Sequence, residues 1–370
     1  MKIGIPTELK AGETRVGLMP SAVAELVRAG HSVWVEADAG MECGFSNQQY
    51  RDAGAEIAAD GAEVYARARL VVKVKEPQPT EVALLNERHL LFTYLHLAAA
   101  PELAQSLAAT GVTAIAYETV TGEGGDLPLL TPMSEVAGRL SVQAGACHLE
   151  NSRGGRGVLL GGVPGVAAAN VVIIGGGVVG FQAAYMASAL GARVRVFDKS
   201  LPRLRYLDSL FRARVSCEYA TAEPLLAAIA DADLVIGAVL VPGAKAPQIL
   251  SREDIASMPC GSVIVDVAID QGGCFATSKA TTHQQPTYVE RGVVHYCVAN
   301  MPSAVGRTST AALSHATLAY VRQLADEGLS ACQQNPHLRA GVNLYDGQVT
   351  HKAVAEALAT SFQPFAWPCD

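Results

Sequence analysis

Four side chains that could carry out chemistry each follow a short apolar segment typical of a buried strand. They are Arg15 after 2–5, Lys75 after 71–74, His96 after 91–95 and Asp270 after 263–269. Ligands of open α/β sheets bind beyond the carboxyl ends of the strands. Arginine can bind a carboxylate, lysine can bind it or polarise a carbonyl, histidine transfers protons near neutral pH, and aspartate can orient water or hold an ammonium ion. The set suits redox chemistry at the Cα of a small amino or oxo acid.

Each of these residues also has a simpler interpretation when it is considered alone. Arg15 could be a solvated surface charge, and Lys75 a strand-end lysine beside Glu76. His96 could be a hydrogen-bonded core histidine, and Asp270 could cap a turn. Their common placement at strand ends of two lobes, in an expected cleft, favours a functional site over these alternatives.

A glycine pattern in the middle of the chain predicts a dinucleotide-binding unit. The apolar run 171–174 precedes Gly175, Gly177 and Gly180, which form G-x-G-x-x-G, and Asp198 ends the next predicted strand. The glycines allow a sharp turn, close approach of a pyrophosphate and close helix packing. Amide groups at the helix start favour phosphate. Asp198 would accept hydrogen bonds from ribose hydroxyls and repel a 2′-phosphate, which indicates NAD over NADP; a phosphate-free turn is the structural alternative.

Composition excludes several classes of protein. The 370 residues suggest two or three domains, and 50% apolar with 17% charged residues is typical of a globular enzyme. A net charge of −7 argues against a nucleic-acid partner. Eight cysteines without a C-x-x-C spacing suggest reduced thiols in a cytoplasmic protein, with no metal site. The first residues predict a strand and not a signal peptide.

One long uncharged stretch invites a membrane interpretation, which the sequence itself opposes. No charged residue occurs between Arg156 and Arg193. The stretch contains nine glycines, Pro164 and Asn170, which predict loops, a strand and a glycine-rich turn. We therefore expect no membrane partner.

Alternating strand and helix patterns predict an α/β fold with two doubly wound parallel-sheet lobes, of which the NAD lobe is a Rossmann fold. Strands are expected at 2–5, 32–36, 70–74, 90–95, 113–117, 234–238, 262–266 and 293–297. Helices are expected at 21–29, 100–109, 134–151 and 308–327, and the tail 330–361 is predicted to be mostly helical. The expected domains are a substrate domain, 1–130 plus 305–370, and an NAD-binding domain, 131–304.

Several longer strings carry a family resemblance over essentially the whole chain. They lie at 4–16, 72–77, 92–97, 132–138, 154–157, 161–165, 240–247, 270–273 and 298–302. In these strings the chain resembles the NAD-dependent L-alanine dehydrogenases, whose family also includes the NAD-binding subunit of proton-translocating transhydrogenase.

The resemblance implies reversible oxidative deamination of L-alanine to pyruvate and ammonium by a homohexamer. It implies that Arg15 and Lys75 bind the substrate and that His96 and Asp270 act as the acid–base pair. The cofactor residues that it implies are Ser134, Val178, Asp198, Arg203, Val239, Leu240, Ala268, Ile269, Asp270, Lys279, Val298, Ala299, Asn300 and Met301.

The chain departs from the family pattern at three positions, and three other functions remain open. Gly12 replaces the usual asparagine, Ala220 a frequent serine, and Lys279 an expected arginine. One alternative is a transhydrogenase-like subunit, which normally works with a membrane-embedded part. A second is a dehydrogenase of another small acid, such as glycine with glyoxylate, or serine. The third is an NAD sensor without turnover, which would not need the four convergent polar residues.

Overall fold

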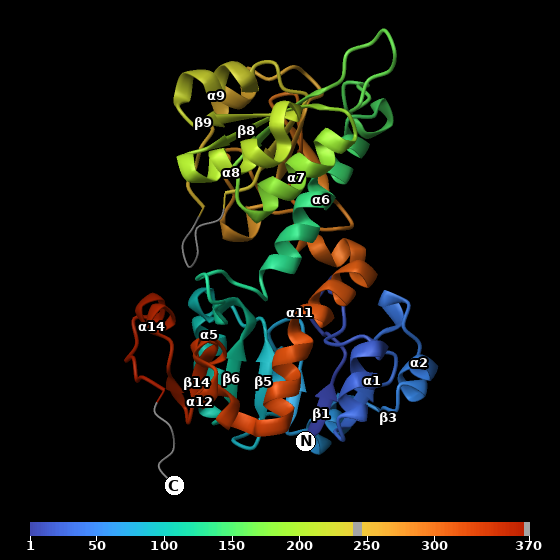
Figure 1. Cartoon of the computed structure of the whole chain (residues 1–370), viewed down its shortest axis with the longest axis vertical. Coiled ribbons are helices and arrows are strands. Elements are labelled where there is room, and N and C mark those ends of the chain that lie inside the picture. The colour runs from blue at the N-terminus through green and yellow to red at the C-terminus, as the bar shows by residue number, and fades with distance from the viewer. Residues whose placement is uncertain (240–245, 366–370) are drawn as a thin grey trace. The chain divides into compact units, whose positions relative to one another are not determined.

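The structure is a computed structural model that describes residues 1–239 and 246–365 (Figure 1). It contains two compact units, one formed by Met1–Met133 with Val305–Asp370 and the other by Ser134–Ala304. Each unit is built on a mostly parallel sheet with helices, which confirms the predicted α/β class. Within the described residues no helix is both long and apolar enough to cross a membrane.

The first unit holds an eight-stranded sheet with the order β15-β14-β6-β5-β4-β1-β2-β3. Its strands are β1 (Lys2–Ile5), β2 (Ser32–Glu36), β3 (Glu56–Ala58), β4 (Leu70–Val72), β5 (Leu90–Thr93), β6 (Thr113–Ala116), β14 (Val342–Tyr345) and β15 (Gln348–Val349). The strands β1 to β6 pair in parallel. Strands β4, β5 and β6 are buried along their whole length, as expected for parallel strands covered on both faces.

Helices of the first unit alternate with these strands. They are α1 (Pro20–Arg28), α2 (Asn47–Asp52), α3 (Gly61–Arg67), α4 (Pro79–Val82), α5 (Pro101–Ala109), α11 (Gly306–Glu327), α12 (Ala331–Gln334), α13 (Pro336–Ala340) and α14 (Lys352–Leu358). The returning helix α11 packs beside α1 and η1 (Met41–Cys43), and Thr310 on it accepts a hydrogen bond from the Val16 amide. The C-terminal segment thus completes the unit that the N-terminal segment begins.

The tail 330–361 contains helices α12, α13 and α14, but the prediction that it is mostly helical missed two strands. Strands β14 and β15 form an antiparallel hairpin, and β14 pairs antiparallel with β6. Two residues connect them, Asp346 with φ +47° and Gly347 with φ +71°. Asp-Gly with two positive φ angles is the preferred composition of a two-residue hairpin turn. That turn signal outweighs the helical periodicity of the residues around it.

The second unit holds a seven-stranded sheet with the order β12-β13-β11-β10-β7-β8-β9. Its strands are β7 (Asn170–Ile174), β8 (Arg193–Asp198), β9 (Val215–Tyr219), β10 (Leu234–Gly237), β11 (Val263–Asp266), β12 (Thr287–Glu290) and β13 (Val293–Tyr296). Only β12 pairs antiparallel among them. The order β9-β8-β7-β10-β11-β13 is the Rossmann order, with the switch point between β7 and β10.

Helices of the second unit connect these strands. They are α6 (Thr131–His148), α7 (Val178–Ala189), α8 (Leu201–Phe211), α9 (Ala222–Ile229) and α10 (Arg252–Ala256); the first three residues of α6 belong to the first unit. Apolar residues of β7, β10 and β11 pack with α9 and α10 into a core that includes Ile229 and Ile255. This core fixes the strand ends at which the glycine loop is located.

Candidate functional site

The glycine loop after β7 has the backbone geometry that a pyrophosphate requires. Gly175 has φ +100°, and a Cβ there would lie 2.6 Å from the carbonyl oxygen of Ala238. A Cβ on Gly180 would lie 1.8 Å from the carbonyl oxygen of Gly175, so helix α7 approaches the strand more closely than another residue would permit. A Cβ on Gly177, which precedes α7, would meet no atom within 4 Å. A ligand could therefore approach the backbone at Gly177, next to the first amides of α7, which lack partners within the helix itself.

Asp198 and Arg203 hold this loop from the neighbouring strand and helix. The Asp198 carboxylate accepts hydrogen bonds from the amides of Gly176 (2.6 Å) and Ser200 (2.7 Å). Arg203 donates to the carbonyl oxygens of Gly176 and Gly177. Each carboxylate oxygen can accept more than one hydrogen bond, so these contacts are compatible with additional ribose hydroxyls.

Other predicted cofactor residues follow the carboxyl ends of adjacent strands of the same sheet. Val239 follows β10, Ala268 and Ile269 follow β11, and Val298, Ala299, Asn300 and Met301 follow β13. Val178 begins α7 and Ser134 lies on α6. Leu240 lies outside the described residues. The Lys279 ammonium forms an ion pair with Glu290 (3.0 Å) and lies over the Tyr288 ring. Its side chain therefore contacts strand β12, which carries both residues.

Asp270 lies in the short helix η6 (Ile269–Gln271), and its side chain is exposed. Its carboxylate accepts from the amide of Asn300 at 3.2 and 3.3 Å, and Asn300 adopts a left-handed φ of +57°. The loop itself is held by buried Asp266, which accepts from the amides of Ala268 (3.1 Å) and Cys274 (2.8 Å). Sequence reasoning missed Asp266, although an acid ending an otherwise apolar strand was a usable signal.

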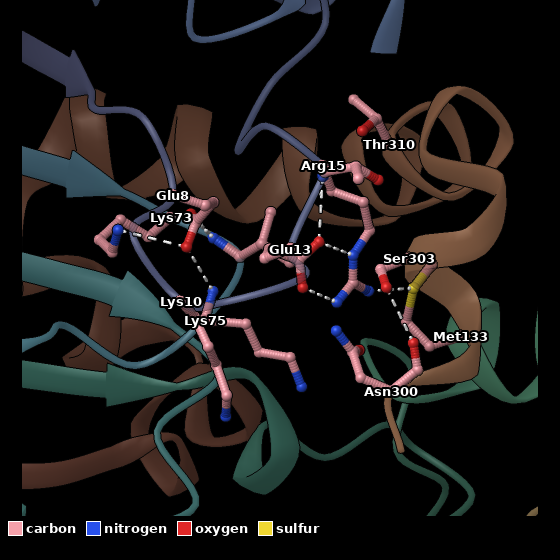
Figure 2. Close-up of polar contacts among 12 residues, drawn as sticks. Glu8, Lys10, Glu13, Arg15, Lys73, Lys75, Met133, Asn300, Ser303 and Thr310 are labelled. Atoms are coloured by element: carbon pink, nitrogen blue, oxygen red, sulfur yellow. Dashed lines mark hydrogen bonds and ion pairs between the residues drawn. The ribbon is translucent and has the colours of Figure 1, made fainter. Parts of the chain in front are cut away.

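In the first unit, Arg15 is not the surface charge that the simpler interpretation assumed. Arg15 is only 2% exposed to solvent. Its Nε and Nη2 atoms donate hydrogen bonds to the two carboxylate oxygens of Glu13 at 2.6 and 2.5 Å. Its Nη1 atom lies 3.0 Å from the sulfur of Met133 (Figure 2). Desolvation alone would lower the pKa of Arg15, but the Glu13 carboxylate raises it above its ordinary value. The guanidinium is therefore charged and held in one plane.

Lys75 is presented by a buried ionic cluster that sequence reasoning also missed. Just before it, fully buried Lys73 has its Nζ atom 3.2 Å from Glu8 and 2.6 Å from Glu81. Glu8 also accepts from the backbone amides of Val74 (2.6 Å) and Lys75 (3.2 Å) (Figure 2). Burial raises the pKa of Glu8, and the Lys73 ammonium opposes that shift. The carboxylate of Glu76, the next residue, forms an ion pair with Lys10.

His96 follows β5 in a left-handed conformation with φ +51°. The carboxylate of Glu118 accepts from its backbone amide at 2.6 Å, and its ring stacks on Tyr94 with the ring centroids 5.8 Å apart. Desolvation lowers the pKa of His96, the Lys75 ammonium lowers it further, and Glu118 opposes the change. The protein atoms packed around the imidazole therefore bias it towards its neutral form.

Electrostatic contacts link three of the predicted site residues in the first unit. The charge of Lys75 acts on His96, whose ring stacks on Tyr94, and the charge of Arg15 acts on the Tyr94 hydroxyl. Two cations and an imidazole with a lowered pKa thus lie on the loop after β1 and after the carboxyl ends of β4 and β5. This arrangement can hold a small carboxylate next to a proton acceptor.

Comparisons with known proteins match the chain over nearly its full length. The family description "Alanine dehydrogenase/PNT, N-terminal domain" matches residues 4–137, and "Alanine dehydrogenase/PNT, C-terminal domain" matches residues 141–352. The chain belongs to the alanine dehydrogenase/PNT family. The family resemblance seen in the sequence motifs is therefore confirmed.

Relatives within this family are similar along both domains. The chain is 56% identical over 363 residues to an alanine dehydrogenase of Halomonas elongata, with 98% of each chain covered. It is 54% identical to that of Bacillus subtilis, over 98% of this chain and 96% of the relative. A solved L-alanine dehydrogenase superposes with a TM-score of 0.94 at 53% identity, covering 97% and 99% of the two chains. A Sinorhizobium meliloti transhydrogenase, at 24% identity and a TM-score of 0.82, shares the fold.

Two glycine substitutions should separate stability from dinucleotide binding. Gly180→Ala places a Cβ against the Gly175 carbonyl and should cost about 1–3 kcal/mol of unfolding free energy, as overpacking does. Gly177→Ala places its Cβ in open space, and should leave the thermal midpoint within about 1 °C of wild type. Its dissociation constant for NADH, measured by fluorescence titration, should rise at least about tenfold. Equal losses of stability in the two variants would contradict this assignment.

The pKa of His96 can be measured by hydrogen–deuterium exchange at its imidazole C2 position. We expect a value below the ordinary value of about 6.5, so the neutral form persists to more acidic pH. Lys75→Met removes a cation and should raise the pKa, whereas Glu118→Gln removes an anion and should lower it. Shifts of the same sign in both variants would show that these charges do not control His96.

Proposed function

We propose that this chain catalyses the reversible, NAD-dependent oxidative deamination of L-alanine to pyruvate and ammonium. Identities of 56% and 54% to curated alanine dehydrogenases over at least 96% of each chain carry the proposal. The polar residues at the strand ends support it, because they supply a cationic carboxylate site and two proton-handling groups. We further propose that the first unit is the substrate domain and the second the NAD-binding domain.

NAD fits the residues at the carboxyl edge of the second sheet. Gly177 leaves space where a Cβ would project, and the start of α7 offers amides to a pyrophosphate. Asp198 ends the neighbouring strand, where it would accept from ribose hydroxyls and repel a 2′-phosphate. NAD, when bound, supplies the acceptor for a hydride from the Cα of alanine.

Arg15 and Lys75 bind the carboxylate of the substrate in this proposal. Arg15 is fixed in orientation by Glu13, and a guanidinium so held gives directional, charge-assisted hydrogen bonds. Lys75 adds a second positive charge on the same side of the first sheet, near His96. Two cations favour the anionic amino and oxo acids over neutral amines or ketones. The small size of the preferred side chain is inferred from the relatives alone.

His96 and Asp270 handle the protons. Loss of a proton from the substrate's ammonium group and of a hydride from Cα gives an iminium ion. Water then adds to the iminium carbon, and ammonia leaves. His96, biased towards the neutral form, accepts a proton from the attacking water. The exposed Asp270 carboxylate, held by the Asn300 amide, stabilises the positively charged nitrogen. In reductive amination each group acts in the opposite direction.

Absorbance at 340 nm tests the proposal directly. We expect L-alanine to reduce NAD⁺, and pyruvate with ammonium to oxidise NADH, each with kcat on the order of 1–10³ s⁻¹. Glycine and L-serine serve as parallel substrates, and a higher kcat/KM with either would reassign the substrate. Absence of turnover with all three, together with intact NADH binding, would favour a sensor or a transhydrogenase-like subunit. Analytical ultracentrifugation tests the homohexamer that the resemblance implies.

Asp198 should control the choice between NAD and NADP. Asp198→Ala removes the charge that repels a 2′-phosphate, so the ratio of kcat/KM values for NAD⁺ over NADP⁺ should fall at least about tenfold. The control is Asp208→Ala, which removes one negative charge from helix α8 of the same unit and should keep the wild-type ratio. An unchanged ratio in Asp198→Ala would remove Asp198 from the ribose site.

A further inference from the structure

One buried carboxylate connects the two segments that carry the proposed substrate-binding cations. Glu8 lies in the loop between β1 and Arg15, and its side chain is 1% exposed. Its carboxylate accepts hydrogen bonds from the backbone amides of Val74 and Lys75, which follow β4. The loop that bears Arg15 is therefore hydrogen-bonded, through this one side chain, to the peptide from which Lys75 projects (Figure 2).

The neighbouring contacts hold that carboxylate in place. Lys73 directly precedes Val74 in the sequence, and its ammonium group lies between the carboxylates of Glu8 and Glu81. Glu81 is itself fixed by the Tyr65 hydroxyl (3.1 Å) and by the amide of Gln78 (2.8 Å). Buried carboxylates of this kind require a cation or several donors, and Glu8 has both. Its two oxygens cannot move without leaving a buried partner unsatisfied.

The amide contacts of Glu8 set the direction of Lys75. Strand β4 ends at Val72, and Pro77, which lacks a backbone N–H, cannot donate to a neighbouring strand. Besides Glu8, the backbone of Lys75 is held by the Thr93 hydroxyl, which donates to its carbonyl oxygen at 2.9 Å. These contacts fix the peptide groups on both sides of the Lys75 Cα, and they leave little freedom for the direction of its Cα–Cβ bond.

We propose that Glu8 is a positioning residue that sets the distance between Arg15 and Lys75, and so tunes affinity for the substrate carboxylate. The proposal rests on the function proposed above. Glu8 touches neither substrate nor cofactor, and it acts through the Val74 and Lys75 amides. Lys73 maintains the ionised form of Glu8 against the cost of burial.

The competing explanation is that the cluster only stabilises the fold, and Glu81 provides the control. Glu81→Gln and Glu8→Gln each remove one negative charge from Lys73, and both side chains are at most 4% exposed. Only Glu8 contacts the Val74 and Lys75 amides. A purely structural role predicts the same consequences for both variants, whereas a positioning role predicts different ones.

Steady-state kinetics of the purified full chain measure the difference. In Glu8→Gln we expect KM for L-alanine and for pyruvate to rise at least about tenfold, with a smaller fall in kcat and with Kd for NADH within about twofold of wild type. In Glu81→Gln we expect KM within about threefold of wild type, whatever its thermal midpoint. Equal rises of KM in the two variants would overturn the proposal.

A conservative variant keeps the test informative if Glu8→Gln does not fold. Glu8→Asp retains the charge for Lys73 but shortens the side chain by one methylene, so it cannot keep both amide contacts and the ion pair. A KM rise of at least about threefold, with NADH binding intact, would support positioning. Wild-type KM in a folded Glu8→Asp would overturn it.

A chemical readout separates this inference from the proposed activity. The rate at which trinitrobenzenesulfonate modifies Lys75, followed by peptide mass spectrometry, requires no turnover. Relative to the wild-type chain, this modification rate should change at least about threefold in Glu8→Gln and less than twofold in Glu81→Gln. If the wild-type chain does not oxidise alanine, the proposed function fails, yet this labelling still tests whether Glu8 orders Lys75. Equal labelling rates in both variants would contradict that role.

Discussion

Parallel strand pairing is the constraint on which both candidate regions depend. Strands β1, β4 and β5 are hydrogen-bonded neighbours, so the segments bearing Arg15, Lys75 and His96 all leave the first sheet at its carboxyl edge. Strands β8, β7, β10, β11 and β13 do the same for the glycine loop, Asp198 and Asp270 in the second sheet. Register along these strands therefore determines which side chains meet, before any contact among them forms.

The sheets place the proposed site residues approximately, and contacts with buried charged groups then fix the orientation of these residues. Arg15 is held by Glu13, and the peptide of Lys75 by Glu8, with Lys73 and Glu81 completing the cluster. Such groups are costly to desolvate and are weak evidence for added stability. Their value here is orientation, because each carboxylate fixes a cation or the backbone that presents one. The Glu118 carboxylate likewise holds the backbone of His96, a residue with positive φ, by accepting a hydrogen bond from its amide.

Much of this could be predicted from the sequence, because strand periodicity and the glycine pattern are local signals. The strands 2–5 and 32–36 were predicted at their observed bounds, and the glycine turn was predicted between a strand and a helix, as observed for β7 and α7. The hairpin around Asp346 was missed because an adjacent helical pattern obscured a two-residue turn signal.

Residues that act through long-range contacts were not predictable in the same way. Glu8 contacts Lys73 although the two are 65 positions apart in the sequence, and a lysine inside an apolar strand does not reveal which acids will surround it. Glu118 likewise contacts His96 only once β5 and β6 are paired. The structure also corrects the interpretation of Arg15 as a surface charge, since its burial depends on the loop as a whole. Gly12, where the family resemblance led us to expect asparagine, has φ +76°, a left-handed conformation that glycine and asparagine adopt more readily than most residues.

The central claim is that this chain moves a hydride from the Cα of alanine to NAD. The most direct measurement uses L-alanine carrying deuterium at Cα, with NAD⁺ and the purified chain, and determines the mass of the reduced cofactor. The account predicts NADH that is one mass unit heavier, with the deuterium on the nicotinamide ring. Reduced cofactor without deuterium, or none formed in the presence of alanine, would contradict it.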